Sequence, residues 1–462
     1  MFRLLGKTHC NFVPDFIDII SRINNNRMKK RLIMAVVLAT AGIQVSHTQT
    51  PRPLDIHGLF ELIDTHNSSV RVSKTSIESA RHEVEAAKSQ RLPDINAQLS
   101  ASFIGNALLT DRDFGEVHGL HSPHFGNQFI VDARQTIYSG GALTAGIKLS
   151  ELGLEKASIA SDLTIQQQCF LALSQYLDLE KIANKEQVVK SNIDLTAKII
   201  SDIEARQRQG VALKNDVTRY ELQMQTLKLD LTRLRNQRAI INHQLCVSLG
   251  LATTDSVVPT EHVAAKTFAR EAEAQWQAAA VSSPTLRLAA VDEQMAHQSE
   301  RLAKSEMLPK VAVVAQNNFN GPITFELPPV DKNLNIWYVG VGVSYPVSSL
   351  FKSNKKLRAA KVAAREAQER KTVAQELVGN QMQAAWTNYQ QSYVELQTQQ
   401  KSAELARQNF EVVNDRYINQ LALVTDMIDA SNMRLDAELA EADARINIAY
   451  AYYKMKFIAG EL

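Results

Sequence analysis

Four segments of the chain alternate apolar with polar residues, which is the pattern of a β-strand with one apolar and one polar face. The predicted strands cover about residues 94–104, 127–138, 310–320 and 335–346. The fourth strand has apolar residues at every second position, namely Trp337, Val339, Val341, Val343 and Tyr345. Its other face includes small uncharged residues such as Gly340 and Gly342, which suits contact with water.

Two very long helices follow the predicted strand pairs. Residues 142–209 and 352–419 each run for 68 positions without a proline, which corresponds to roughly 100 Å of α-helix. Shorter helices are predicted at 213–249 and 422–458, and the first of these shows the 3–4 spacing of a coiled-coil seam. A further helix over 71–92 is expected to lie end to end with the 213–249 helix, so that two short helices match one long helix.

The same order of elements occurs twice in the chain. Residues 66–95 align with residues 282–311 at an offset of 216, and both stretches contain Leu-Pro just before a strand. Proline ends the helix at that point because it cannot continue the hydrogen-bond ladder. Further on, GVALKNDV at 210–217 parallels QLALVTDM at 420–427. Two matches in the same order indicate an internal duplication.

The N-terminal region has the parts of a secretory signal peptide. Met28-Lys-Lys-Arg31 is basic, Leu32–Leu38 is apolar, and Ala39-Thr-Ala41 offers a cleavage site of small residues. A buried N-terminal helix is the alternative interpretation. The predicted organisation is an upstream extension 1–27, a signal peptide 28–41, an N-terminal segment 42–65, a first repeat 66–250, a linker 251–281 and a second repeat 282–462.

Composition and charge argue against some classes of protein. Aromatic residues make up only 6% of the chain, which suits long helices better than a β-rich enzyme. Seven of the 51 basic and two of the 49 acidic residues lie in residues 1–41, so the remainder is slightly acidic. That balance offers no basic footprint for nucleic acid. After the signal, no stretch approaches 18 uninterrupted apolar residues, so no transmembrane helix is predicted.

The four half-apolar strands raise the question of what covers them. A soluble sandwich with one face on a core is one interpretation, but no predicted helix is obviously shaped to cover the sheet. In lipid, an open sheet edge would leave backbone groups unsatisfied, and the smallest membrane barrels use eight strands. Four strands therefore need other copies of the chain to complete the wall. Three copies would supply twelve strands, although the pattern alone does not choose three.

At this point the chain resembles the TolC, or outer-membrane efflux protein, family over about residues 54–457. The resemblance rests on the two Leu-Pro sites, on Tyr138-Ser-Gly-Gly141 leading into a long helix, and on the two hairpin turns, all in doubled order. It implies a mainly α fold with a small β part, built from two tandem strand–strand–helical hairpin repeats. It also implies a homotrimer whose twelve-stranded outer-membrane barrel continues as a periplasmic α-helical coiled-coil barrel, with residues 251–281 at its equator.

Family membership further implies a function and a set of partners. The expected protein is not an enzyme and needs no cofactor or metal. It is the exit channel of a tripartite efflux pump or a type I secretion system, in the cell outer membrane of a Gram-negative bacterium. The implied partners are a periplasmic adaptor protein, an inner-membrane transporter of the RND, ABC or MFS type, and outer-membrane lipid.

The resemblance also assigns roles at the two hairpin turns. Asp426 and Asp429 match paired aspartates that ring the periplasmic entrance, where six carboxylates of a trimer would favour multivalent cations. Tyr417 and Asp216 match residues that hold this gate shut, but the position of their basic partner is Ala422 here. The alternative for the two aspartates is an ordinary place at a helix N-terminus, where the dipole favours acids.

The same turns are the expected docking site of the adaptor. The matching residues are Gln209, Gly210, Val211, Asn419, Gln420 and Leu421. Gly210 also suits a left-handed helix C-cap, and the two roles are compatible. Gln420 stands where glycine is usual, so a tighter second turn or an altered groove is expected.

Two further sets of residues are candidates for a metal site or a disulfide. His118, His121 and His124 share the loop between the first two strands, where an exposed loop is favoured over a metal site. Cys169 and Cys246 lie on separate helices, and buried hydrophobic positions are favoured over a disulfide.

Two other classes of protein compete with the channel. No catalytic triad, phosphate loop or dinucleotide fingerprint stands out in the chain. A periplasmic adaptor would also have a signal and a helical hairpin, but a single one flanked by two β halves. A coiled-coil scaffold of the cell envelope would leave the duplication and the strands unexplained.

Overall fold

The computed structural model describes residues 50–261, 263, 266, 268, 272–326 and 329–462. The predicted upstream extension and signal peptide lie outside these residues. The chain divides into two units, one made of Met1–Pro51 with Thr254–Ser256 and the other of Arg52–Thr253 with Val257–Leu462. All of the helices and the main sheet described below belong to the second unit.

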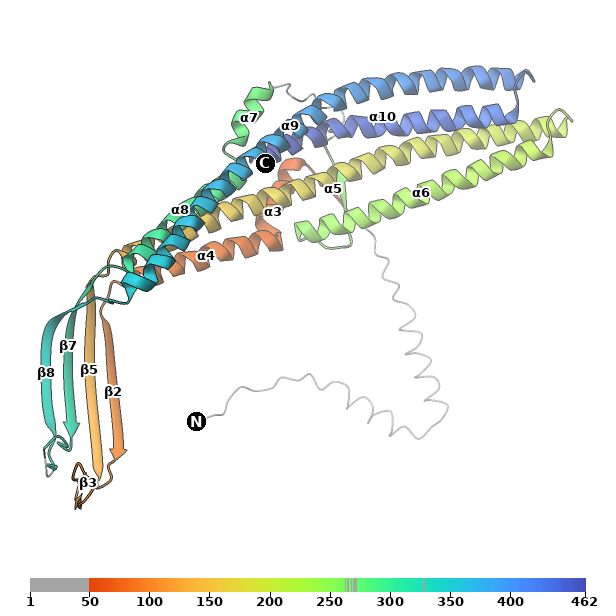
Figure 1. Ribbon diagram of the computed structural model, residues 1–462. Helices are drawn as coiled ribbons and strands as arrows, with labels where there is room; N and C mark the ends of the chain where they lie inside the picture. Colours follow the sequence, from red (N-terminus) through yellow and green to blue (C-terminus); the bar gives the residue numbers. More distant parts are fainter. Residues whose placement is uncertain (1–49, 262, 264–265, 267, 269–271, 327–328) are drawn as a thin grey trace, which may run out of the picture. The chain divides into compact units, whose positions relative to one another are not determined.

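The main sheet has four antiparallel strands in the order β2-β5-β7-β8 (Figure 1). Their bounds are Asp94–Phe103, Phe125–Tyr138, Lys310–Gly321 and Leu334–Ser344. The central pair joins the two repeats, because β5 comes from the first and β7 from the second. In the described residues, β2 and β8 each have one neighbour, so the sheet has two open edges.

The strand register gathers the predicted apolar residues on one face of the sheet. Ala97 lies opposite Val131, and Ala133, Ala315 and Val339 form one row across three strands. The residues of this face are exposed at the edges, with Leu99 at 79% and Val341 at 69%. Nothing in the described part of the chain buries them, so the soluble-sandwich interpretation does not fit.

The opposite face of the sheet is mostly polar, although Ile130 and Ile336 also lie on it. Asn96 donates to Asp132 across β2 and β5 at 3.1 Å, and the hydroxyl of Tyr338 donates to Gln316 across β7 and β8 at 2.8 Å.

Of the residues predicted to face lipid, Trp337, Val339, Val341 and Val343 are exposed within β8. Tyr345 is also exposed, one residue beyond its end.

Two long helices, α5 (Ala142–Arg208) and α9 (Ser349–Ile418), contain 67 and 70 residues. Each is followed by a 36-residue helix, α6 (Lys214–Leu249) and α10 (Val424–Ala459). Two 22-residue helices, α4 (Ser68–Ser89) and α8 (Pro284–Ser305), pack beside the long ones (Figure 1).

The helices form two rows that share the long helices. One row has the order α6–α5–α10–α9 and the other α4–α5–α8–α9. Both α4 and α6 therefore pack on α5, and both α8 and α10 pack on α9. The predicted fold class, mainly α with two strand–strand–hairpin repeats, is confirmed.

The segments outside the repeats contain structure that the pattern did not reveal. Helices α3 (Ile56–His66) and α7 (Glu273–Ala280) lie here, with the paired strands β1 (Thr50–Leu54) and β6 (Asp255–Pro259). A hairpin of β3 (Ala107–Thr110) and β4 (Val117–Leu120) adds to the first strand loop. The expectation of only four strands was wrong, because segments of four or five residues are too short to show alternation.

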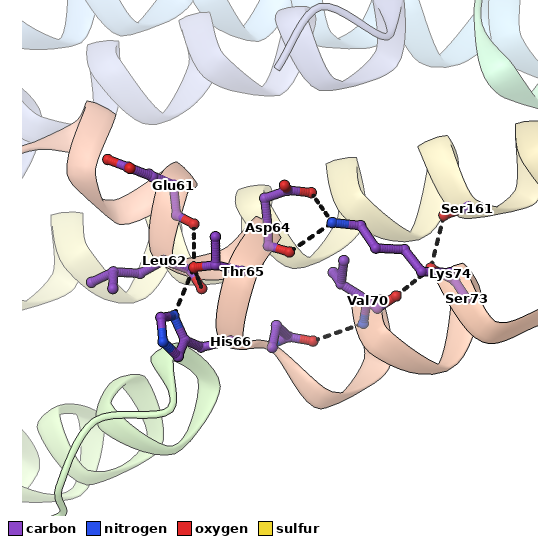
Figure 2. Close-up of polar contacts among 10 residues, drawn as sticks. Glu61, Leu62, Asp64, Thr65, His66, Val70, Ser73, Lys74 and Ser161 are labelled. Atoms are coloured by element: carbon purple, nitrogen blue, oxygen red, sulfur yellow. Dashed lines mark hydrogen bonds and ion pairs between the residues drawn. The ribbon is translucent and has the colours of Figure 1, made fainter.

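The junction of α3 and α4 shows how the first repeat is anchored (Figure 2). Asn67 caps α4 by accepting from the backbone N–H groups of Ser69 and Val70. Lys74 reaches back and donates to the side chain of Asp64 at 2.8 Å. Ser73 bonds Ser161 of α5 at 2.9 Å, which ties α4 to the long helix.

The largest apolar core lies where α3, α5, α6, α7, α9 and α10 meet. It contains the fully buried Leu59, Tyr176 and Leu249. Cys169 and Cys246 lie in the same core, and no disulfide joins them. Burial, together with the charge of Asp64, raises the pKa of Cys169 to about 11, so this thiol is inert at neutral pH. None of the helices in the described part of the chain combines the length and apolar character that crossing a membrane requires.

Candidate functional site

The turn between α5 and α6 has the geometry of a Schellman motif. Gly210 adopts φ of 77°, which is the left-handed conformation that glycine reaches without steric cost. The N–H of Val211 donates to the carbonyl of Arg206 at 3.0 Å, and the N–H of Gly210 donates to Gln207 at 2.9 Å. These bonds satisfy the last carbonyls of α5 and end the helix.

The turn between α9 and α10 has the same backbone. Gln420 adopts φ of 62° where the first turn has glycine, and Leu421 N–H donates to the carbonyl of Arg416 at 2.7 Å. The expectation of a tighter second turn was wrong. An exposed side chain accepts the left-handed conformation, so the two turns keep one geometry and Gln420 bears the strain.

We expect replacement of Gln420 by glycine to stabilise the second turn by about 1 kcal/mol, because a residue with a Cβ atom is disfavoured in the left-handed region by that order. Amide exchange at Asn419–Leu423 should slow by about fivefold. Gly210→Ala is the matched control in the first turn and should change exchange in the opposite direction. Unchanged exchange in both variants would mean that the turns store no such strain.

The helices after the turns begin in the same way. Asp216 accepts from the backbone N–H of Leu213 at 3.2 Å, and Asp426 accepts from that of Leu423 at 3.0 Å. The two aspartates occupy equivalent positions in the duplication, at an offset of 210. Both therefore satisfy a free donor at a helix N-terminus, as the alternative interpretation of Asp426 requires.

Asp429 differs from Asp426 in its contacts. It is exposed, one turn further along α10, and the structure shows no hydrogen bond or ion pair for its carboxylate within the described residues. Its equivalent in the first repeat is Arg219. The two predicted gate acids thus lie on one face of α10, and Asp429 is the one whose carboxylate is not engaged by the turn.

A groove of about 380 Å³ opens between the two turns. Its charged and aromatic lining comes from both repeats, namely Arg206, Asp216, Arg219 and Tyr417. Both residues predicted to hold the gate shut therefore share this groove. In the described part of the chain no hydrogen bond joins Tyr417 to Asp216, whose carboxylate accepts from the backbone N–H of Leu213.

Arg206, which the sequence did not single out, is the cation that reaches across the groove. Its Nη1 donates to the carbonyl of Ile418 at 3.0 Å, and its guanidinium lies 5.8 Å from the ring centre of Tyr417. The pKa of Tyr417 is raised by burial first and by Asp216 next, while Arg206 acts in the opposite direction. The only hint in the sequence is the arginine at the equivalent position, Arg416.

An apolar cluster supports the turns from behind. It contains Val217, Tyr220 and Met427 together with Phe410 of α9. Among the described residues, the buried hydroxyl of Tyr220 has no hydrogen-bond partner. Burial raises its pKa, as does Tyr417 to a smaller extent. The cluster joins all four helices near their ends, so the turns are held on a packed base.

The residues predicted to dock an adaptor are all exposed at the turns. Apolar side chains are exposed at equivalent places in both repeats, with Val211 at 49% and Leu421 at 69%. Two residues further along each turn, Leu213 and Leu423 are also exposed at equivalent places. Each turn therefore presents a small apolar surface next to the groove.

The histidine loop does not assemble a cluster of metal ligands. The rings of His121 and His124 lie 5.4 Å apart, but Nδ1 of His124 bonds the carbonyl of Ile104. His118 lies beside Glu116 instead. In the residues that the structure describes, no three side chains of His, Cys, Asp or Glu gather as metal ligands would.

Comparison with known proteins agrees with this architecture. The outer membrane efflux protein model matches residues 59–251 and 276–461. No curated protein sequence matches the chain. The fold is similar to that of the outer-membrane channel OprN, at 16% identity and a TM-score of 0.73, covering 88% of this chain and 90% of that chain.

Two further solved structures share the fold. The outer membrane protein VceC from Vibrio cholerae is 14% identical with a TM-score of 0.74, and the match covers 88% of this chain and 96% of that chain. The CmeC outer membrane channel of Campylobacter jejuni is 13% identical with a TM-score of 0.72, covering 88% of this chain and 85% of that chain. The family is one of channels rather than enzymes, and both of its repeats are matched here. The chain therefore belongs to the outer membrane efflux protein family and is an outer-membrane efflux channel of a Gram-negative bacterium.

Proposed function

We propose that the chain works as a homotrimer, as the passive exit channel of a tripartite efflux pump or a type I secretion system. The observation that carries this proposal is the four-stranded sheet with two open edges and one uncovered apolar face. Lipid offers no partner for the unpaired backbone groups of β2 and β8. Joining β8 of one copy to β2 of the next would close a ring, and three copies would supply twelve strands.

In the row α6–α5–α10–α9, the two end helices, α6 and α9, support the same assembly, in which one end of each subunit contacts the other end of the next. Helix α6 has a line of exposed apolar residues on one face, namely Leu222, Leu229, Ile240 and Val247. The part of α9 that packs on α10 has a second such line, which includes Val394, Leu405 and Val412. At 100° per residue, the α6 positions lie within about 20° of one another.

These two lines lie on opposite ends of one helix row, because the order is α6–α5–α10–α9. A surface that fits a different surface on the next copy generates a closed ring when the rotation is right. In such a ring, α6 of each subunit covers the part of its neighbour's α9 that packs on α10, together with the apolar line there.

The hairpin turns are the proposed contact with an adaptor. Exposed apolar side chains next to a polar groove are typical of interaction surfaces. Two such turns per subunit would offer six docking positions around a trimer. The gate is proposed at the same end, with Asp426 and Asp429 lining the opening. The cargo would be chosen by the inner-membrane transporter, of the RND, ABC or MFS type, that supplies the energy.

The two competing functions predict different behaviour. A periplasmic adaptor has a single hairpin, whereas this chain has two that pack together. A coiled-coil scaffold would stay soluble without detergent. Planar bilayers containing the purified mature protein separate the proposals, because a channel should give discrete conductance steps. An adaptor or a scaffold should give none.

A further inference from the structure

The two hairpin turns differ in one contact although their backbones match. At an offset of 210, Arg206 is equivalent to Arg416, and the pair Gln207 and Arg208 is equivalent to the pair Tyr417 and Ile418. The duplication therefore places an arginine at the same point before each turn. A comparison of the surroundings of these two arginines shows how each hairpin is joined to its neighbour.

Of these two arginines, Arg206 is the one that contacts the neighbouring hairpin within the described residues. It is half-buried, donates to the Ile418 carbonyl at 3.0 Å, and lies over the ring of Tyr417. A guanidinium over an aromatic face gains both electrostatic and packing energy. Arg416 is exposed, and no hydrogen bond, ion pair or ring contact of its side chain is seen in the described residues.

In a ring of subunits, each hairpin has one neighbour in its own subunit and one in the next. By the internal symmetry, Arg416 would meet Gln207 and Arg208 of the next subunit where Arg206 meets Tyr417 and Ile418. Gln207 supplies no aromatic ring there, and Arg208 brings its own guanidinium close to that of Arg416. The equivalent contact between subunits would therefore be weaker than the contact within one subunit.

A second pair of equivalent contacts supports this use of the symmetry. Within one subunit, Gln223 of α6 donates to Asn432 of α10 at 2.6 Å. The equivalent residues are Met433 and Leu222, which are 59% and 64% exposed. Apolar residues at these places suit a contact between subunits. Copies would thus adhere above the turns, while the contact between subunits at the turns themselves lacks the aromatic ring.

We propose that Arg206 latches the two hairpin tips of one subunit together. The tips separate first between subunits, and the mouth of the duct opens fully only when this latch within each subunit also breaks. This inference rests on the proposed trimeric channel and concerns how its gate is held. Arg206 supplies the cation that is missing at Ala422, from another helix and within one subunit. Arg206 donates to a backbone carbonyl and lies over an aromatic ring, so this contact depends on no carboxylate.

The test compares Arg206→Ala with Arg416→Ala in the purified mature protein. Both variants remove the same side chain from equivalent positions, so Arg416→Ala is a matched control. We expect Arg206→Ala to raise the ratio of open to closed channel in planar bilayers by about tenfold, as the loss of a cation–π contact and a hydrogen bond implies. Arg416→Ala should stay within about twofold of the unchanged protein.

Amide exchange gives a second readout that needs no conductance. Exchange in the last turns of α5 and α9 should accelerate in Arg206→Ala and remain unchanged in Arg416→Ala. Equal effects of the two arginine variants, or no effect of Arg206→Ala, would overturn the latch. Absence of any conductance from the unchanged protein would instead count against the proposed channel, and exchange would still test the latch.

Discussion

Arginine in place of Val341 is expected to abolish assembly of the channel in the outer membrane. Val341 is 69% exposed on the apolar face of β8, where no other part of the described chain covers it. An arginine on the lipid face of a barrel costs about 2–4 kcal/mol near the bilayer centre. Three copies per channel multiply this cost. Fractionation of cells followed by measurement of the trimer yield gives the result directly.

The matched control for this substitution is the preceding residue. Gly340→Arg places the same side chain on the opposite, polar face, and a Cβ atom at Gly340 would meet nothing within 4 Å. We expect normal assembly of this variant, because the arginine would enter water rather than lipid. If Val341→Arg assembled normally and Gly340→Arg failed to assemble, the two faces of the sheet would be reversed.

Removal of both Asp426 and Asp429 should weaken block of the channel by divalent and trivalent cations by at least about tenfold. In a trimer the two residues would place six carboxylates around one opening, and such a ring binds multivalent cations. The measurement is the concentration of cation that halves the single-channel current. Unchanged block in the double alanine variant would remove both residues from the gate.

The single variants should divide this effect unequally. The carboxylate of Asp429 is exposed and not engaged, so Asp429→Ala should account for most of the lost block. Asp426 accepts from Leu423 N–H at 3.0 Å, so its replacement should also loosen the start of α10 by about 1 kcal/mol. Asp216→Ala removes the equivalent bond in the first repeat and serves as the control for that structural effect. Equal loss of block in the two single variants of α10 would contradict the division.

The large elements of this fold could be predicted because their signals are long. Alternation over about ten residues predicts each main strand, and an absence of proline over 68 residues predicts each long helix. The same logic explains what was missed. Strands such as Ala107–Thr110 are too short for a period to appear. They depend on hydrogen bonds to a partner strand, which local sequence does not encode.

In the candidate site, some residues could be predicted from the sequence and others could not. Asp426 and Asp429 could be found from their spacing and from the family resemblance. The latch of Arg206 on Ile418 could not, because its acceptor is a backbone carbonyl that any residue would supply. Nor did the sequence show that Gln420 follows the path of Gly210, since glycine is the usual signal for that conformation and is absent there.

Assembly into a trimer is tested most directly by the mass of the mature protein after extraction from the outer membrane in detergent. Native mass spectrometry should find three chains in one particle, because four strands per chain leave two edges to be paired. A single chain that stays in solution without detergent and is missing from the outer-membrane fraction would contradict the assembly on which the proposed channel depends.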